Sequence, residues 1–293
     1  RHLTRTWVAN LDGLLRERMA RGDPKLYRTF FTRDCVQRRT SFEAGGARYN
    51  WSVVSYQGVA TLTDSLYAIQ HMVFTTGGVA PDELLAALAA DFRGFAPLQR
   101  RLRALPKYGN DDPAVDGPGA AMVACAWREL LRHCPPRGGR YLPSVINFAT
   151  YAQAGRQVGA TPDGRNAGMP LDDSVGPHAG RDTRGPTALL NSVLRMPVGL
   201  AIGTPVLNLR FARDLLATDQ GIAGVAALVR TYFRRGGLQI QISVVDQAAL
   251  RAAQEDPDAY ADLLVRIGGY SEYFTRLDRA TQESVIARCE HGL

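Results

Sequence analysis

Short apolar runs that alternate with helical patterns constrain the fold of this 293-residue chain more than any other feature. Strands are predicted at Tyr141–Tyr151, Val206–Phe211 and Leu238–Val245, and an amphipathic helix at Ile222–Phe233 separates the last two. The Gly- and Pro-rich stretch from Cys134 to Pro186 predicts loops around the first of these strands. Single buried strands alternating with helices favour an α/β architecture.

Apolar residues at helical spacing account for much of the remaining chain. Asp246 and the pair Asp256-Pro257 each carry a cap or first-turn signal, so a helix is predicted after each of them. Further helices are predicted at Leu3–Met19, Val59–Phe74, Asp82–Phe92, about Ala114–His133, Thr187–Leu194 and about Asp278–Glu290.

The net charge of +7 invites comparison with nucleic-acid-binding proteins, but the distribution of the basic residues argues against that class. Of the 35 basic residues only Lys25 and Lys107 are lysines, a skew typical of a GC-rich coding bias. No run of about 18 apolar residues is present, so we expect no membrane span. Because the chain begins at Arg1 inside an amphipathic pattern without a signal peptide, we expect a fragment of a cytoplasmic protein.

The cysteines and histidines show no spacing typical of a metal site, and no bound metal is expected. Reduced thiols in a cytoplasmic protein are the simplest interpretation of the four cysteines. These are Cys35, Cys125, Cys134 and Cys289.

A glycine pair near the C-terminus carries the strongest functional signal. On its own, Gly268-Gly269 is typical of a turn, because glycine adopts backbone angles that other residues avoid. Its surroundings are more specific: the stretch from Val265 to Phe274 resembles the signature of glycyl radical domains, Arg-Val-x-Gly-Tyr followed by an aromatic residue. The later residues of that signature match Leu277, Gln282, Val285, Ile286 and Arg288.

Four more segments resemble the glycyl radical enzyme family, and they occur in the family's order. Together with the glycine signature they cover nearly the whole chain. They are Gly45–Asn50 with Gly58 and Asp64–Leu66, Lys107–Pro113, Gly159–Arg165 with Gly180–Asp182, and Gly185–Ala188 with Asn191–Val193.

The resemblance implies that Gly269 carries a glycyl radical. Loss of a hydrogen atom from its α-carbon leaves an electron shared between a flanking nitrogen and a carbonyl, and a planar centre without Cβ suits that sharing. The resemblance also implies that a radical-SAM activase installs the radical and that no organic cofactor is bound. Arg266, Ile267 and Tyr270 are expected either to help the activase recognise the loop or to pack it.

The resemblance further implies a ten-stranded α/β barrel made of two five-stranded halves, with surrounding helices. This chain is expected to supply the second half. We expect the C-terminal part of the pyruvate formate-lyase-like barrel domain at residues 1–165 and the glycyl radical domain at 166–293. The full-length enzyme is expected to be a homodimer.

The segment Gly185–Ala188 is more similar to the dehydratase and eliminase branch, which cleaves C–O, C–N or C–C bonds of small substrates, than to pyruvate formate-lyase. Formate acetyltransferase activity and a non-catalytic spare-part radical domain stay open as alternatives.

In the family the radical passes to a cysteine in a Gly-Cys-x-Glu motif. Here Asp34 and Gln37 replace the glycine and the glutamate around Cys35, so a buried packing role is expected for Cys35. The thiyl cysteine is therefore expected to be missing from this chain.

Overall fold

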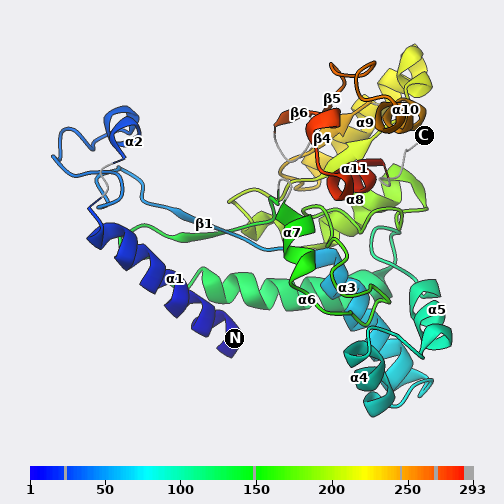
Figure 1. Cartoon of the computed structure of the whole chain (residues 1–293). Helices are drawn as coiled ribbons and strands as arrows, with labels where there is room; N and C mark the ends of the chain where they lie inside the picture. The colour runs from blue at the N-terminus through cyan, green and yellow to red at the C-terminus, as the bar shows by residue number, and fades with distance from the viewer. Residues whose placement is uncertain (23–24, 148–149, 245, 267–269, 287–293) are drawn as a thin grey trace. The chain divides into compact units, whose positions relative to one another are not determined.

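The computed structural model describes residues 1–22, 25–147, 150–244, 246–266 and 270–286 (Figure 1). For Ala280 and Ser284 it describes the backbone alone. The chain divides into two compact units, and each is described here by itself. The first unit comprises Arg1–Ser55, Ala124–Ser144 and Leu200–Gly203. The second comprises Tyr56–Val123, Val145–Gly199 and Thr204–Leu293. Neither unit is a continuous stretch of sequence.

In the first unit, two helices and a small parallel sheet surround a limited core. The predicted N-terminal helix is α1 (His2–Ala20), and its buried residue is Val8. A short helix, α2 (Leu26–Phe31), follows. Strands β1 (Ser52–Ser55) and β2 (Tyr141–Ser144) pair in parallel. All four residues of β2 are buried, whereas burial alternates along β1, as expected when one face of the strand is uncovered.

The second unit begins with helices that share one apolar core. Helix α3 (Val59–Ile69) continues into the π-helix η1 (Gln70–Thr75), so the predicted helix Val59–Phe74 is confirmed. Pro81 opens α4 (Pro81–Ala89), as its fixed φ favours at a first turn. Helix α5 (Ala96–Ala104) was not predicted, because only Leu98 and Leu102 of its nine residues are buried. The shared core consists of Ala68, Met72, Val79, Leu84, Ala87, Phe92, Leu98 and Leu102.

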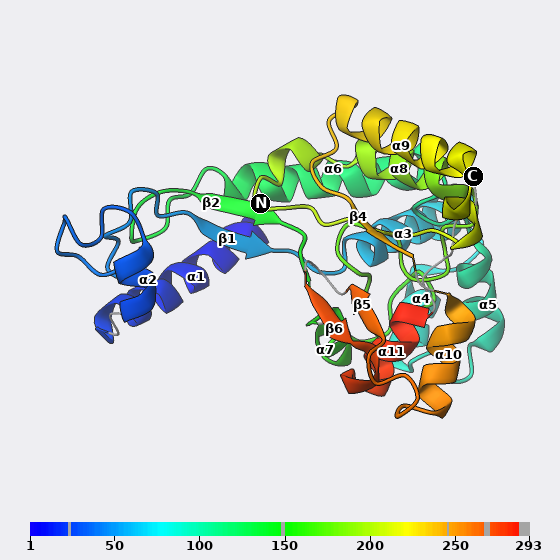
Figure 2. The ribbon, with the colours of Figure 1, turned by 90° about the horizontal axis from the view of Figure 1, so that it is seen from above.

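Helix α6 (Pro113–Leu130) comes next in the chain, and its residues up to Val123 belong to the second unit. Figure 2 shows α8 and α9 side by side, and α10 and α11 next to the strands β5 and β6. The other elements are α7 (Thr150–Arg156), α8 (Gly185–Arg195), η2 (Val198–Leu200), β3 (Asn208–Arg210), η3 (Asp214–Ala217), α9 (Asp219–Arg234), β4 (Gln241–Ser243), α10 (Gln247–Glu255), β5 (Leu264–Arg266), β6 (Ser271–Tyr273), η4 (Phe274–Arg276) and α11 (Arg279–Ile286).

The mixed α/β class is confirmed. Within the described ranges the strands form three two-stranded sheets, two parallel (β1–β2 and β3–β4) and one antiparallel (β5–β6), and no closed sheet. No helix among the described residues is long and apolar enough to cross a membrane.

One predicted strand is confirmed only in part, and one predicted helix was wrong. The apolar run Tyr141–Tyr151 is a strand only as far as Ser144, and its end belongs to α7. No helix follows Asp256-Pro257. There Asp256 does accept a hydrogen bond from the Ala259 amide (3.2 Å), but the amide of Tyr260 bonds to the carbonyl of Pro257, which is the spacing of a turn.

Candidate functional site

Strands β5 and β6 form the antiparallel hairpin that contains the expected radical residue. Arg266 and Ser271 face each other at the end of the ladder, and the Arg266 Nη1 donates a hydrogen bond to the Ser271 Oγ (3.2 Å). Gly269 and Ile267 lie outside the described residues. Tyr270 is described, and its side chain is 38% exposed. The sequence places Gly269 in the connection between these two strands, four residues long.

Beneath the hairpin lies a small core of its own. Val265 of β5 is 4% exposed, and Phe274, which directly follows β6, is fully buried. The Gln282 Nε2 donates a hydrogen bond to the Phe274 carbonyl (2.9 Å), which ties α11 to the end of the hairpin. The buried members of this core are Leu250, Ala253, Val265, Phe274, Val285 and Ile286.

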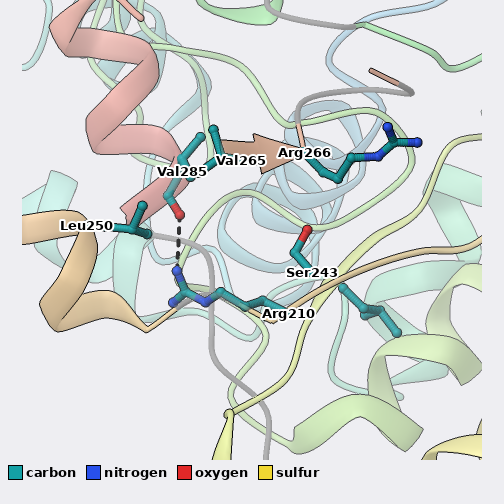
Figure 3. A pocket seen from close by; sticks show the side chains of 7 residues that line it. Arg210, Ser243, Leu250, Val265, Arg266 and Val285 are labelled. Carbon is teal, nitrogen blue, oxygen red and sulfur yellow. Dashed lines mark hydrogen bonds between the residues drawn. The ribbon is translucent and has the colours of Figure 1, made fainter. Parts of the chain in front are cut away.

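A narrow cavity separates this core from strands β3 and β4 (Figure 3). Its volume is about 10 Å³, room for a single water molecule. The Arg210 side chain crosses this region, and its Nη1 donates a hydrogen bond to the carbonyl of Val285 (3.2 Å). The lining residues are Leu209, Arg210, Ser243, Leu250, Val265, Arg266 and Val285.

Elsewhere in the second unit, segments that carried the family resemblance meet at one half-buried arginine. The Arg181 Nη1 lies 2.6 Å from the Asp64 Oδ2 and 2.6 Å from the Asp163 Oδ2. The two carboxylate side chains are 1% and 0% exposed, respectively. A single guanidinium therefore links α3, the turn at residues 161–165 and the loop before α8.

The burial of this cluster has electrostatic consequences. Burial raises the pKa of the Asp64 carboxyl to about 6, although the Arg181 guanidinium acts in the opposite direction. Burial also lowers the pKa of the Lys107 ammonium to about 8. The Lys107 Nζ donates to the carbonyls of Leu102 and Leu105, both at 2.8 Å. These contacts are typical of a cluster that stabilises the fold more than of a catalytic site.

The family-like segment Lys107–Pro113 extends this cluster. The Tyr108 amide donates to the Asp64 Oδ1 (2.7 Å), and the Asn110 Nδ2 donates to the Arg181 carbonyl (2.7 Å). Asp112 precedes the first residue of α6, and its Oδ1 accepts a hydrogen bond from the Ala114 amide (2.9 Å).

The Asn191-Ser192 segment on α8 binds the same turn from its other side. The Asn191 Nδ2 donates to the Asp111 Oδ2 (2.8 Å), and the Asp111 amide donates to the Ser192 Oγ (2.9 Å). Four of the five family-like segments thus contribute residues to one polar network. Contacts in the folded protein account for polar residues that the sequence alone does not connect.

A surface groove of about 400 Å³ borders this network, and three of the four cations that line it bind other groups of the protein. Arg181 binds the two carboxylates described above, and the Lys107 ammonium binds two main-chain carbonyls. Arg103 donates to the Gly164 carbonyl (2.9 Å) and to the Asn166 Oδ1 (2.7 Å). The fourth cation, Arg184, is exposed.

The three described cysteines differ in how far their side chains are buried. Cys35 is 1% exposed, as predicted for a packing residue, whereas Cys134 is exposed. Cys125 is half-buried within α6, and Cys289 lies outside the described residues. Among the residues that the structure describes, no group of three or more His, Cys, Asp or Glu side chains is placed to hold a metal ion.

Arg210 is the residue near the hairpin that the sequence analysis missed. The sequence does contain a sign of its role, since a charged residue inside the predicted buried strand Val206–Phe211 requires a partner. That partner is the main chain of α11, 75 residues further along the chain.

Comparison with known proteins agrees with the motifs. Residues 7–155 match the family model for pyruvate formate lyase-like proteins, and residues 171–275 match the glycine radical model. The probable dehydratase YbiW of Escherichia coli (strain K12) is 37% identical over 270 residues, which cover 89% of this chain and 33% of that protein. The trans-4-hydroxy-L-proline dehydratase of Clostridioides difficile is 36% identical over 88% of this chain and 33% of that protein.

A solved structure agrees as well. The glycerol-bound form of the B12-independent glycerol dehydratase from Clostridium butyricum superposes with a TM-score of 0.87 and 37% identity. The superposition covers 90% of this chain and 34% of that structure, so the chain spans about a third of the length of the relatives that it matches. The matched glycine radical domain implies a post-translational glycyl radical. The chain belongs to the glycyl radical enzyme family.

Proposed function

We propose that this chain provides the radical-bearing part of a glycyl radical enzyme, with the radical on Gly269. The observation that carries the proposal is the β5–β6 hairpin, which lies within the matched glycine radical domain and has Gly269 in its connection. Arg266 and Ser271 close the base of that connection by their side-chain hydrogen bond. A glycine there can lose one α-hydrogen atom without a Cβ opposing the planar radical.

The reaction that we propose belongs to the dehydratase and eliminase branch. Two named relatives are dehydratases of trans-4-hydroxy-L-proline and glycerol, and another is an isethionate sulfite-lyase from Desulfovibrio desulfuricans, 34% identical over 83% of this chain. In such chemistry a thiyl radical takes a hydrogen atom from a small substrate, and a neighbouring group then leaves. Because Cys35 is buried, we place the thiyl cysteine in a part of the protein outside this chain.

The remaining two thirds of the polypeptide would complete the ten-stranded barrel. Apolar side chains at the surface of the first unit support this, since Trp7, Tyr27 and Phe31 are 60%, 84% and 86% exposed. Large apolar surfaces of this kind mark places where further protein packs. We place the barrel part at residues 1–165 and the glycyl radical domain at 166–293, within a cytoplasmic homodimer.

A radical-SAM activase would generate the radical, with Arg266, Ile267 and Tyr270 recognised at the hairpin or packing it. Tyr270 is accessible for such recognition. The hydrogen atom removed from the Gly269 α-carbon would pass to the organic radical that the activase forms by cleaving S-adenosylmethionine. The enzyme itself would then need no bound organic cofactor.

Electron paramagnetic resonance of the anaerobically activated full-length protein tests this assignment. The radical on a glycine α-carbon keeps one α-hydrogen, so we expect a doublet signal from the wild-type protein and none from Gly269→Ala. Gly268→Ala is the matched control, because it changes the neighbouring glycine of the same loop, and its signal should persist. A doublet that survives in Gly269→Ala would overturn the assignment.

A further inference from the structure

The β3–β4 pair forms a fixed frame beside the radical hairpin. Arg210 of β3 is opposite Ser243 of β4 in a parallel ladder, and its side chain is only 4% exposed. Strand β3 is anchored at its other end, where the Asn208 Nδ2 donates to the Asp173 Oδ2 (2.9 Å) and the Gln241 Nε2 donates to the Asn208 Oδ1 (2.7 Å). The start of the Arg210 side chain is therefore held in place.

The other end of the Arg210 side chain binds the main chain of α11. Nη1 donates to the carbonyls of Val285 (3.2 Å) and Ile286 (3.4 Å), and Nη2 approaches the Ile286 carbonyl (3.5 Å). These carbonyls belong to the last described residues of α11. Figure 3 shows the guanidinium directed at the Val285 carbonyl across the cavity.

Helix α11 in turn positions the hairpin. Val285 and Ile286 pack in the same core as Val265 and Phe274, the buried residues on the two sides of the hairpin. Val265 precedes Arg266 at the base of the connection that contains Gly269. Contacts among the described residues thus run from the β3–β4 frame, through Arg210 and α11, to Val265 and Phe274 of the hairpin.

Hydrogen bonds, more than close packing, hold this junction. The cavity of about 10 Å³ lies between the frame and the hairpin core at Arg210. A gap at this point forfeits part of the dispersion energy that close packing would provide. Bonds from a buried guanidinium to carbonyls are stronger than bonds between neutral groups, and they are directional.

We propose that Arg210 is a positioning residue for the radical loop: it sets the place of the β5–β6 hairpin relative to the β3–β4 frame through the carbonyls of Val285 and Ile286. The proposal rests on the proposed function for the identity of the radical residue. The mechanical part, Arg210 acting on the hairpin, does not depend on that identity.

Amide hydrogen exchange of the full-length protein tests the mechanical part before any activation. We expect Arg210→Met to raise exchange in the peptides of the hairpin and α11 about tenfold, the effect of losing a hydrogen bond to a charged group. Peptides of α3 and α4 should be unchanged. Arg210→Lys, which keeps the cation and reaches fewer carbonyls, should restore part of the protection. Arg213→Met is the matched control, since Arg213 is exposed on the same segment, and it should leave the hairpin unchanged.

Hairpin exchange equal to wild type in a folded Arg210→Met protein would overturn the proposal. If that variant does not fold, Arg210→Lys alone decides: faster exchange confined to the hairpin and α11 supports the proposal, and unchanged or uniformly faster exchange overturns it. In the activated protein, we expect Arg210→Met to lower the radical yield more than Arg213→Met does. Absence of a radical from the wild-type protein would instead refute the assignment of Gly269 while leaving the exchange result valid.

Discussion

Replacement of Arg181 by methionine should be among the most damaging single changes in the second unit. Arg181→Met removes a guanidinium that lies 2.6 Å from both Asp64 and Asp163, whose carboxylates are almost fully buried. Removing one partner of a buried ion pair costs about 3–5 kcal/mol, because the remaining charge is left without compensation. Since Arg181 serves two carboxylates, we expect a loss at the upper end of that range.

Urea unfolding followed by circular dichroism measures the total loss, and amide exchange at Tyr108 reports it locally, because the Tyr108 amide donates to the Asp64 Oδ1 (2.7 Å). Arg184→Met is the matched control: this arginine is exposed, and the one described hydrogen bond of its side chain, to the Asn110 carbonyl, is 3.5 Å long. The double variant Arg181→Met/Asp163→Asn should be less destabilised than the two single losses together, by about 1–3 kcal/mol. A loss in Arg181→Met no larger than in Arg184→Met would refute the reasoning.

Three further changes test other parts of the structure. The pKa of Asp64 is raised from 3.8 to about 6 in the folded protein. Its favourable contribution to the free energy of unfolding is therefore present below pH 3.8, the pKa in the unfolded chain, and is lost as the pH rises through about 6. Denaturant titrations should show that this free energy falls by about 3 kcal/mol across that window in the wild-type protein and that Asp64→Asn lacks the decrease. Phe274→Ala should cost about 3–5 kcal/mol by calorimetry, because this fully buried ring fills the hairpin core, and a cost below about 1 kcal/mol would contradict that packing. Gly155→Ala should cost about 1–3 kcal/mol in thermal unfolding, because its Cβ would overlap the Met169 carbonyl oxygen, and an unchanged midpoint would show that α7 does not pack as described.

Helices with a clear start signal could be predicted from the sequence. Pro81 opens α4, and the Asp246 side chain caps α10 by accepting a hydrogen bond from the Ala248 amide (2.8 Å). These signals act within one turn, so a single sequence contains all the information that they need.

The elements that were missed depend on distant partners. Strands β5 and β6 are three residues each, and their pairing with one another distinguishes them from a loop. Asp256-Pro257 carried a valid local cap, yet the chain continues as turns. Local propensity is a weak prior that tertiary context overrides.

The sequence motif names a radical residue, which stays a prediction, but it does not name the residues that support the hairpin. The family-like motif marked Gly269 and Arg266, because the motif is local. Arg210 lies on a different strand and acts through α11, so no spacing in the sequence connects it with the hairpin. Likewise, the meeting of Asp64, Asp163 and Arg181 follows only from the fold.

Exposure of the activated protein to air tests the central claim most directly. Oxygen adds to a carbon-centred radical, and the backbone then breaks at the residue that carried it. Mass spectrometry of the products should show one cut at Gly269 and a C-terminal fragment that begins beside it, and Gly269→Ala should remain whole. A radical signal followed by an uncut chain, or by a cut elsewhere, would contradict the assignment of the radical to Gly269.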